Sequence, residues 1–344
     1  MLYHYYPTLG IFQWGWSSVD LFFVLSGYLI TSRLYPYINN AGILPRFYKN
    51  RVLRIVPLYF LFLILFFGWW FLILPKGTTQ PFPFYSEHWW QFFLYIQNWE
   101  FISHRGEMFT HLQHLWSIAV EEQIYILFPL LLLLLKKGRT IFFSIATLLC
   151  IVVISRTVFI LLNPNGDAFY NVANNTYLRL DGFLSGVLIY FIFQQGMVAV
   201  KNFKWLFSLG LACFAAVATW MIIAQTTEKD NWFISSVGIT LVVLVYACFM
   251  LAILVKRIKI LNAITSNAFL RYAGKISYGI YIFHWPMLII GAGLFNKLAL
   301  HFGWPSNEFS FIIWNTLFCI PLTFLICHFS FRYFESWFLR RKVH

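Results

Sequence analysis

The sequence predicts an all-α, polytopic transmembrane helix bundle, on the basis of its composition, its apolar runs and the distribution of its charges. Of its 344 residues, 60% are hydrophobic, 22% are aromatic and only 11% are charged, whereas soluble domains average about 25% charged residues. Runs of about 20 nearly uncharged residues, the length that crosses about 30 Å of hydrocarbon, recur along the chain. We therefore expect one integral membrane domain over residues 1–344, with no soluble domain large enough to fold alone.

Nine runs are apolar enough to be interpreted as membrane-spanning helices. In chain order they cover residues 16–32, 57–74, 115–135, 140–162, 177–193, 204–224, 233–255, 276–294 and 310–331. The longest connection, residues 75–114, contains the aromatic stretch His88-Trp89-Trp90-Gln91-Phe92-Phe93, which is typical of an interfacial or re-entrant segment. We find no internal repeat.

The basic residues divide between alternate loops. Of the 25 Lys and Arg residues, 19 lie in the loops on one side of the nine spans. These are Arg33, Arg46, Lys49, Arg51, Arg54, Lys136, Lys137, Arg139, Lys201, Lys204, Lys256, Arg257, Lys259, Arg271, Lys275, Arg332, Arg340, Arg341 and Lys342. The other side has only Lys76, Arg105, Lys229 and Lys297. By the positive-inside rule the first set is cytoplasmic, together with the C-terminus. The net charge of +13 is then a feature of topology, and we expect no nucleic-acid partner.

This topology places Met1 outside the membrane. The segment that it begins, Met1-Leu2-Tyr3-His4-Tyr5-Tyr6-Pro7, has neither the basic region nor the cleavage site of a signal peptide. An uncharged external N-terminus is unusual. We therefore expect a tenth, upstream helix of which residues 1–10 form the outer end, so that the chain begins within a truncated helix.

Ionisable residues in the spans cluster at one depth. Such residues are costly in a bilayer unless they are paired, so each is a candidate functional residue. The cluster near the outer side comprises His4, Asp20, Glu121, Glu122, Arg179 and Asp181. We expect these six residues to converge in a catalytic or binding site. The alternative is a structural ion-pair network that ties helices together.

The cytoplasmic side has a different candidate site. Arg51 and Arg54 are three residues apart and therefore share one helical face. Planar guanidinium groups suit phosphate oxygens, so these two residues are expected to bind a nucleotide-bearing donor. The alternative is a positive anchor that contacts lipid head groups.

Six segments of the sequence occur in the order that is typical of one known family. They are residues 16–30 (WSSVDLFFVLSGYLI), 51–57 (RVLRIVP), 114–125 (HLWSIAVEEQIY), 178–186 (LRLDGFLSG), 274–286 (GKISYGIYIFHWP) and 333–335 (YFE). With these segments the chain resembles the acyltransferase 3 family of bacterial membrane acyltransferases over nearly its whole length.

The resemblance implies a function and a site. Members of that family take an acyl group from cytoplasmic acyl-CoA and place it on a hydroxyl of a polysaccharide, lipopolysaccharide or other glycolipid at the inner membrane of a bacterium. We thus expect acyl-CoA, most simply acetyl-CoA, as the donor substrate, with no permanently bound cofactor. His4 matches the family's catalytic histidine. An imidazole, with an ordinary pKa of about 6.5, can remove a proton from a hydroxyl.

The other site residues follow from the same match. Asp20, Glu121 and Glu122 are expected to act with His4, and Arg51 and Arg54 to bind the donor. The remaining motif residues form a substrate-binding or structural polar network, namely Ser26, Trp116, Ser117, Tyr125, Arg179, Asp181, Lys275, Ser277, Tyr278, His284 and Glu335.

The family also shows where this chain differs. Its members pair the catalytic histidine with an arginine eleven residues earlier, which here would precede Met1, in keeping with the expected upstream helix. Some members carry an extra C-terminal span and a soluble hydrolase-like domain, and we expect neither within residues 1–344.

Two other kinds of site are disfavoured. The cysteines Cys150, Cys213, Cys248, Cys319 and Cys327 all lie in apolar runs and are expected to be apolar filler. The pair His111 and His114 has no carboxylate or cysteine partner at metal-ligand spacing, so no metal is expected there.

Two other functions remain open from the sequence. Buried polar clusters also mark a glycolipid or sugar transporter, although such a protein would be expected to show paired repeats. A non-catalytic accessory subunit of a polysaccharide system is the second alternative.

Overall fold

The computed structural model describes residues 1–6, 12, 14–73, 83–104, 111–163, 168–196, 203–223, 231–255 and 259–342. Within these residues every regular element is a helix, so the predicted all-α class is confirmed. A helix pairs its own backbone N–H and C=O groups, and the hydrocarbon of a membrane offers those groups no other partners. Six of the basic residues used above to sort the loops lie outside the described residues, namely Lys76, Arg105, Lys201, Lys229, Lys256 and Arg257.

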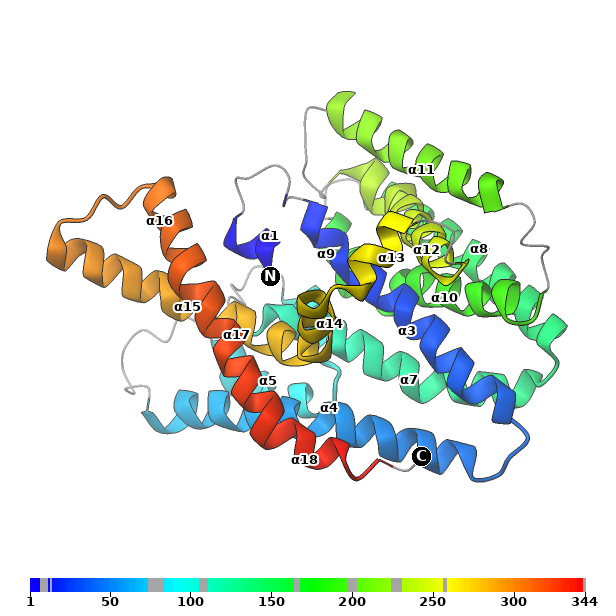
Figure 1. Cartoon of the computed structure of the whole chain (residues 1–344), viewed down its shortest axis with the longest axis horizontal. Coiled ribbons are helices and arrows are strands. Elements are labelled where there is room, and N and C mark those ends of the chain that lie inside the picture. Colours follow the sequence, from blue (N-terminus) through cyan, green and yellow to red (C-terminus); the bar gives the residue numbers. More distant parts are fainter. Residues whose placement is uncertain are drawn as a thin grey trace.

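The helices are numbered as in Figure 1. They are α1 (Leu2–Tyr5), α3 (Ser18–Leu34), α4 (Ile43–Gly68), α5 (Pro83–Phe93), α6 (Gln97–Ser103), α7 (Trp116–Leu135), α8 (Gly138–Leu162), α9 (Ala168–Asn174), α10 (Leu180–Phe193), α11 (Phe203–Ile223), α12 (Ile239–Val255), α13 (Lys259–Ser266), α14 (Ala268–Lys275), α15 (Ser277–Phe302), α16 (Glu308–Trp314), α17 (Ile320–Phe329) and α18 (Ser336–Leu339). Short 3₁₀ or π turns join or extend several of them.

A helix covers each of the nine predicted spans, but they differ in length. Among the described residues, six helices are long and apolar enough to cross a membrane, namely Ile43–Leu72, Gln113–Leu135, Gly138–Leu162, Ile234–Val255, Ser277–Phe302 and Glu308–Leu339. The helices α3 and α10 have 17 and 14 residues, and the apolar part of α11 is also short. The structure thus confirms a polytopic bundle, and the number nine remains a prediction.

Two glycines lie in the contact between α3 and α10, which is the most extensive helix contact among the described residues. A Cβ atom added at Gly27 would collide with the backbone carbonyl of Phe183, and one added at Gly186 would collide with that of Val24. Small residues let helix backbones approach closely in a membrane, where apolar side chains gain nothing by leaving the lipid. The helices α3 and α10 are therefore held against each other, and α3 is fixed in position beside the cavities described below.

The bundle has two chemically different ends. At the first, which we call the basic end, α3 and α7 end and α4 and α8 begin, to the right in Figure 1. Arg33 and Lys137 lie at this end. At the other, which we call the opposite end, α3 and α7 begin and α1 packs against α15. Among the described residues, each end contains a cavity that is lined by polar side chains.

Candidate active site

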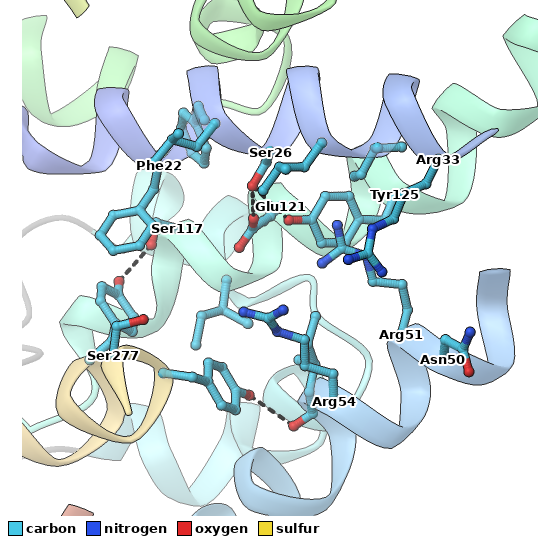
Figure 2. A pocket seen from close by; sticks show the side chains of 18 of the residues that line it. Phe22, Ser26, Arg33, Asn50, Arg51, Arg54, Ser117, Glu121, Tyr125 and Ser277 are labelled. Atoms are coloured by element: carbon cyan, nitrogen blue, oxygen red, sulfur yellow. Dashed lines mark hydrogen bonds between the residues drawn. The ribbon is translucent and has the colours of Figure 1, made fainter. Parts of the chain in front are cut away.

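A cavity of about 480 Å³ lies toward the basic end, between α3, α4, α7 and α15. Its inner part is mainly apolar and includes Phe22, Leu25 and Ile118. Its outer part is cationic, and Figure 2 shows side chains of α3, α4 and α7 directed toward one space. This volume is within the range of small-molecule sites, which are mostly apolar with a few placed polar groups. We call it the basic cavity.

Four cationic residues line the basic cavity. Arg33 comes from α3, Arg51 and Arg54 come from α4, and Lys342 follows α18. Burial, reinforced by the charges of Arg54, Arg33 and Arg51, lowers the pKa of Lys342 to about 8. A group is harder to protonate where like charges gather, so this mouth favours a polyanionic ligand. The predicted pair Arg51 and Arg54 therefore does share one site.

A chain of hydrogen bonds continues inward from the arginines. The guanidinium of Arg51 lies 4.0 Å over the ring of Tyr125, a favourable cation–π arrangement. Tyr125 donates to Ser26 Oγ at 2.9 Å, and Ser26 donates to Glu121 Oε1 at 2.6 Å. Figure 2 shows this group beside Arg51. Glu121 thus belongs to the basic cavity, whereas the sequence placed it beside His4.

A second cavity, of about 450 Å³, lies toward the opposite end, and we call it the histidine cavity. His4, His114 and His284 all line it. The rings of His4 and His284 are 5.5 Å apart between centroids, as are those of His114 and His284. Trp285 packs edge-on against His4 at 4.4 Å. The predicted catalytic histidine therefore does lie in a cavity, in a row of three imidazoles.

Backbone contacts settle the tautomers of two of these histidines. His284 Nδ1 is 2.7 Å from the carbonyl oxygen of Tyr281, and a carbonyl only accepts. The hydrogen is thus on Nδ1, and Nε2 is left with a lone pair. His114 Nε2 donates to the carbonyl of Ile282 at 3.1 Å in the same way. Its buried Nδ1 has no hydrogen-bond partner among the described residues, so it remains an acceptor.

The buried aspartates pair with arginines and line neither cavity. Arg179 donates to Asp20 Oδ1 at 2.5 Å, and Arg156 donates to Asp181 Oδ2 at 2.8 Å. All four residues are almost completely buried. The sequence predicted that Asp20 and Asp181 would converge with His4. The structure instead gives them ion pairs between helices, because an isolated buried carboxylate is costly.

The two cavities share one partition. Val19 and Phe22 of α3 and Ser277 and Tyr281 of α15 line both of them. Tyr281 donates its hydroxyl hydrogen to the carbonyl of His114. Ser117 lies 2.5 Å from the same hydroxyl, to which it therefore donates. A single layer of side chains thus separates the arginines from the imidazoles. We call the four shared residues, Val19, Phe22, Ser277 and Tyr281, the septum.

The other predicted residues lie around this framework. Trp116 and Arg179 line the histidine cavity, where the guanidinium stands 5.9 Å from the indole ring. Tyr278 lines the basic cavity and donates to the carbonyl of Ile55 at 2.8 Å. Besides Asp20 and Asp181, three predicted residues line neither of the two cavities, namely Glu122, Lys275 and Glu335. Glu335 accepts from Ser330 at 3.0 Å, and Lys275 lies 5.0 Å over the ring of Phe331.

Several site residues were missed by the sequence analysis. Tyr281 was read only as part of a motif, His114 was considered only as part of a motif and as a disfavoured metal ligand, and Arg156 was not assigned a role. A signal was present for Tyr281, because Ser277, Tyr281 and His284 are four and then three residues apart. This spacing puts them on one face of a helix. Lys342 had no signal, because only the fold brings it to the cavity.

The chain matches known proteins over most of its length. The family model described as an acyltransferase domain matches residues 2–328. The chain is 30% identical over 294 residues to "O-acetyltransferase OatA" of Staphylococcus aureus (strain NCTC 8325 / PS 47), covering 80% of this chain and 47% of that protein. It is 26% identical over 350 residues to "Putative peptidoglycan O-acetyltransferase YrhL" of Bacillus subtilis (strain 168), covering 94% and 51%.

A third relative is "Peptidoglycan O-acetyltransferase OatA" of Listeria monocytogenes serovar 1/2a. The identity is 27% over 344 residues, with 94% of this chain and 52% of that protein covered. The chain thus spans about half the length of the curated relatives that it matches. No solved structure matches the chain.

Proposed function

Because this chain belongs to the acyltransferase family whose domain model spans residues 2–328, we propose that it is a membrane O-acyltransferase. It transfers an acetyl group from acyl-CoA, which enters the basic cavity, to a hydroxyl of peptidoglycan, which approaches the histidine cavity. The single observation that best supports this proposal is the septum, which is a common wall between a cavity lined by arginines and a cavity lined by histidines.

The donor fits the basic cavity in charge and in shape. Coenzyme A has a phosphate-rich nucleotide and a long, mainly apolar arm that ends in the thioester. The guanidinium groups of Arg33, Arg51 and Arg54 would bind the phosphates in charge-assisted hydrogen bonds. The arm would run along the apolar depth of the cavity, and the thioester would then approach Ser277 and Tyr281.

The acceptor approaches the septum from the histidine cavity, and its hydroxyl meets the thioester between the side chains of the septum. His4 takes the proton of the acceptor hydroxyl as a general base. The hydroxyl oxygen forms a bond to the acyl carbon, the carbon–sulfur bond breaks, and the thiolate leaves and is protonated to free coenzyme A. Ser117 and Tyr281 already donate their hydroxyl hydrogens to Tyr281 and to the carbonyl of His114, so their role is to hold the shape of the septum.

The acceptor and the orientation of the protein complete the proposal. The sequence alone left a polysaccharide, a lipopolysaccharide or another glycolipid as acceptor. Two of the three relatives described above are named for peptidoglycan, which favours peptidoglycan. With the basic end in the cytoplasm, by the positive-inside rule, the donor cavity faces the compartment that supplies acyl-CoA.

The test expresses the full chain in a bacterium that lacks its own peptidoglycan O-acetylation. Base-labile acetate on purified peptidoglycan is measured, together with label transferred from radioactive acetyl-CoA in membranes. We expect the wild-type chain to acetylate peptidoglycan. His4→Gln keeps hydrogen-bonding ability but cannot accept the proton, so transfer should fall by roughly 10²–10⁴-fold.

The matched control is His301→Gln, which changes an exposed histidine at the end of α15. It should transfer at the wild-type rate at equal membrane abundance. Acetate on a different envelope glycan would overturn the acceptor. No label transfer at all by the wild-type chain would overturn the enzymatic function and favour a transporter or an accessory subunit.

A further inference from the structure

A cluster of two histidines and a glutamate lies on α5 and α6, away from both cavities. His88 is on α5, Glu100 is on α6, and His104 directly follows α6. None of them lines the basic cavity or the histidine cavity. One ligand atom from each residue lies within 4.8 Å of those of the other two. The proposed acyl transfer gives this cluster no role.

The three ligand atoms are close to the separation that a single ion requires. His104 Nδ1 is 3.0 Å and His88 Nδ1 is 3.8 Å from the same carboxylate oxygen, Glu100 Oε2. In a tetrahedral zinc site, with ligand bonds of 2.0–2.2 Å, neighbouring ligand atoms are about 3.3 Å apart. One distance is slightly shorter and the other slightly longer than this value. His88 Nδ1 also accepts from Gln91 Nε2 at 3.2 Å, so a side-chain rotation that exchanges this contact for the ion would bring all three atoms onto one ion.

The protein contacts leave ligand capacity unused in this cluster. His104 Nδ1 is buried and, despite its distance from Glu100, has no hydrogen-bond partner among the described residues. The alternative to a metal site is an ion pair between a protonated His104 and Glu100. That pair would normally be a well-directed hydrogen bond, because a charged donor strengthens it. A lone pair on Nδ1 directed at an ion accounts better for this geometry.

Neighbouring side chains orient the three residues. The ring of Phe84 stacks on His88 with centroids 4.6 Å apart, and its centroid is 5.7 Å from that of His104. Gln91 donates to Glu100 Oε1 at 2.8 Å, which leaves Oε2 for the ion. Metal sites commonly hold their ligands in place by such outer contacts. The ring of Phe84 and the side-chain amide of Gln91 therefore hold the ligand side chains in place.

We propose that His88, Glu100 and His104 form a zinc-binding site at the opposite end of the bundle. Two imidazoles and a carboxylate are a common ligand set for zinc, with the fourth position taken by water. Magnesium and calcium are disfavoured, because those ions prefer oxygen ligands. The side chains of His88, Glu100 and His104 are 18%, 26% and 37% exposed, so an ion can enter from solvent.

The proposed zinc ion would join α5 to α6 and thereby fix the segment that covers this end. Beyond the cluster, α6 is tied to the bundle through Asn98, which donates to the carbonyl of Asn174 at 2.8 Å and accepts from Gln123 at 2.9 Å. A metal ion that binds the folded state and not the unfolded state stabilises the fold. The role of the ion is therefore structural, and it does not depend on the transfer reaction.

The test uses the full chain purified in detergent micelles and stripped with a chelator. The stripped protein is dialysed against zinc, and bound metal per chain is measured by mass spectrometry. We expect about one zinc per wild-type chain, and a rise in the midpoint of thermal unfolding when zinc is added. Cobalt, used in place of zinc, should give the visible absorption bands of a nitrogen- and oxygen-ligated tetrahedral ion.

Variants distinguish the site from accidental binding. His104→Ala and Glu100→Gln should each weaken zinc binding by at least 10-fold and abolish the shift in the unfolding midpoint. Glu100→Gln preserves size and hydrogen bonding, so it covers the case in which His104→Ala fails to fold. His301→Ala should bind zinc like the wild type. Equal zinc affinity in the wild type and Glu100→Gln, or no retained zinc in the wild type, would overturn the proposal.

Discussion

Among the individual residues, the two buried arginines have different surroundings. Arg156 uses all three of its nitrogen atoms, donating to the carbonyls of Ser236 and Leu178, to Asp181 and to Thr240. Arg179 donates only to Asp20, and its Nε and Nη1 have no hydrogen-bond partner among the described residues. Arg156 is thus a fully satisfied link between helices. Arg179, which lines the histidine cavity, keeps donors for a ligand or for water.

The ion pair between Asp20 and Arg179 should be needed for stability. Asp20→Asn leaves the guanidinium of Arg179 buried without a compensating charge, which costs about 3–5 kcal/mol when one partner of a buried pair is removed. We expect a lower midpoint of thermal unfolding in detergent. Adding Arg179→Met to Asp20→Asn should recover part of the loss. A double variant as unstable as the sum of the two single variants would show that the pair is not coupled.

The two arginines of α4 should differ in their effect on the donor. Arg51 is half-buried against Tyr125, whereas Arg54 is exposed. Each variant loses a charge-assisted contact worth roughly 1.5–3 kcal/mol. Arg51→Ala should raise the KM for acyl-CoA more than Arg54→Ala does, because Arg51 is the less exposed of the two. Arg51→Lys should restore only part of it, since lysine lacks the planar fork.

The control for this measurement is Arg46→Ala. Arg46 is exposed on the same helix and does not line the basic cavity. Its KM for acyl-CoA should remain that of the wild type. If Arg51→Ala, Arg54→Ala and Arg46→Ala all give the wild-type KM at equal abundance, the arginines are lipid anchors, as the alternative interpretation of the sequence held.

At the scale of helices, α3 and α15 carry most of the site. α3 gives one face to α10 through Gly27 and another to both cavities through Val19 and Phe22. α15 places Ser277 and Tyr281 at the septum. The position of the septum therefore depends on how closely α3 packs against α10.

Alanine at Gly27 or Gly186 should separate α3 from α10. Each added Cβ would meet a backbone oxygen, which cannot rotate away as a side chain can. Overpacking of this kind costs typically about 1–3 kcal/mol, so we expect lower thermal stability and a loss of transfer activity. Gly293→Ala is the matched control, because its Cβ would meet nothing within 4 Å.

The control substitution should change the free energy of unfolding in the opposite direction. An exposed helical glycine replaced by alanine gains roughly 0.5–1 kcal/mol through the smaller entropy loss on folding. The unfolding midpoint of Gly293→Ala should thus equal or exceed that of the wild type. Gly27→Ala with an unchanged midpoint would show that the two helices can separate without cost.

At the scale of the whole molecule, the basic and opposite ends differ in charge as well as in ligand chemistry. Reporters inserted after Lys137 and Gln195, both at the basic end, should read as cytoplasmic. Reporters inserted after Asn163 and Ser306 should read as external. This outcome follows from the positive-inside rule. A reversed result at any two of the four positions would place the donor cavity on the wrong side of the membrane and would contradict the proposed function.

The sequence predicted the fold class and the shared helical face of Arg51 and Arg54 correctly, because both depend on local patterns. Hydrophobic runs specify helices, and Arg51 and Arg54 share a face through simple helical spacing. The partners of the buried charges were not predictable in this way. Asp20 lies far along the chain from Arg179, and only the packing of α3 on α10 brings them together. Depth in the membrane placed the carboxylates at one level but could not show which helix faces met.

The same limit explains why Glu121 lies in the basic cavity and not beside His4. Its depth matched that of His4, yet α7 directs it through Ser26 toward the basic cavity. Residues on one helix at one depth can serve either of two cavities, depending on the rotation of that helix about its axis. The sequence alone does not specify that rotation, which results from contacts with several neighbouring helices.

The thin septum has an electrical consequence for the proposed reaction. Where two water-accessible cavities nearly meet, the voltage across the membrane falls mainly over the layer between them. If the hydroxyl proton leaves to the outside through His4 and the thiolate is protonated from the cytoplasm, each turnover moves one positive charge outward. An interior-negative voltage opposes this movement by up to about 2.3 kcal/mol per 100 mV. If the proton instead crosses the septum between Ser277 and Tyr281, the turnover is electrically silent, so the dependence of the rate on voltage reports the path of the proton.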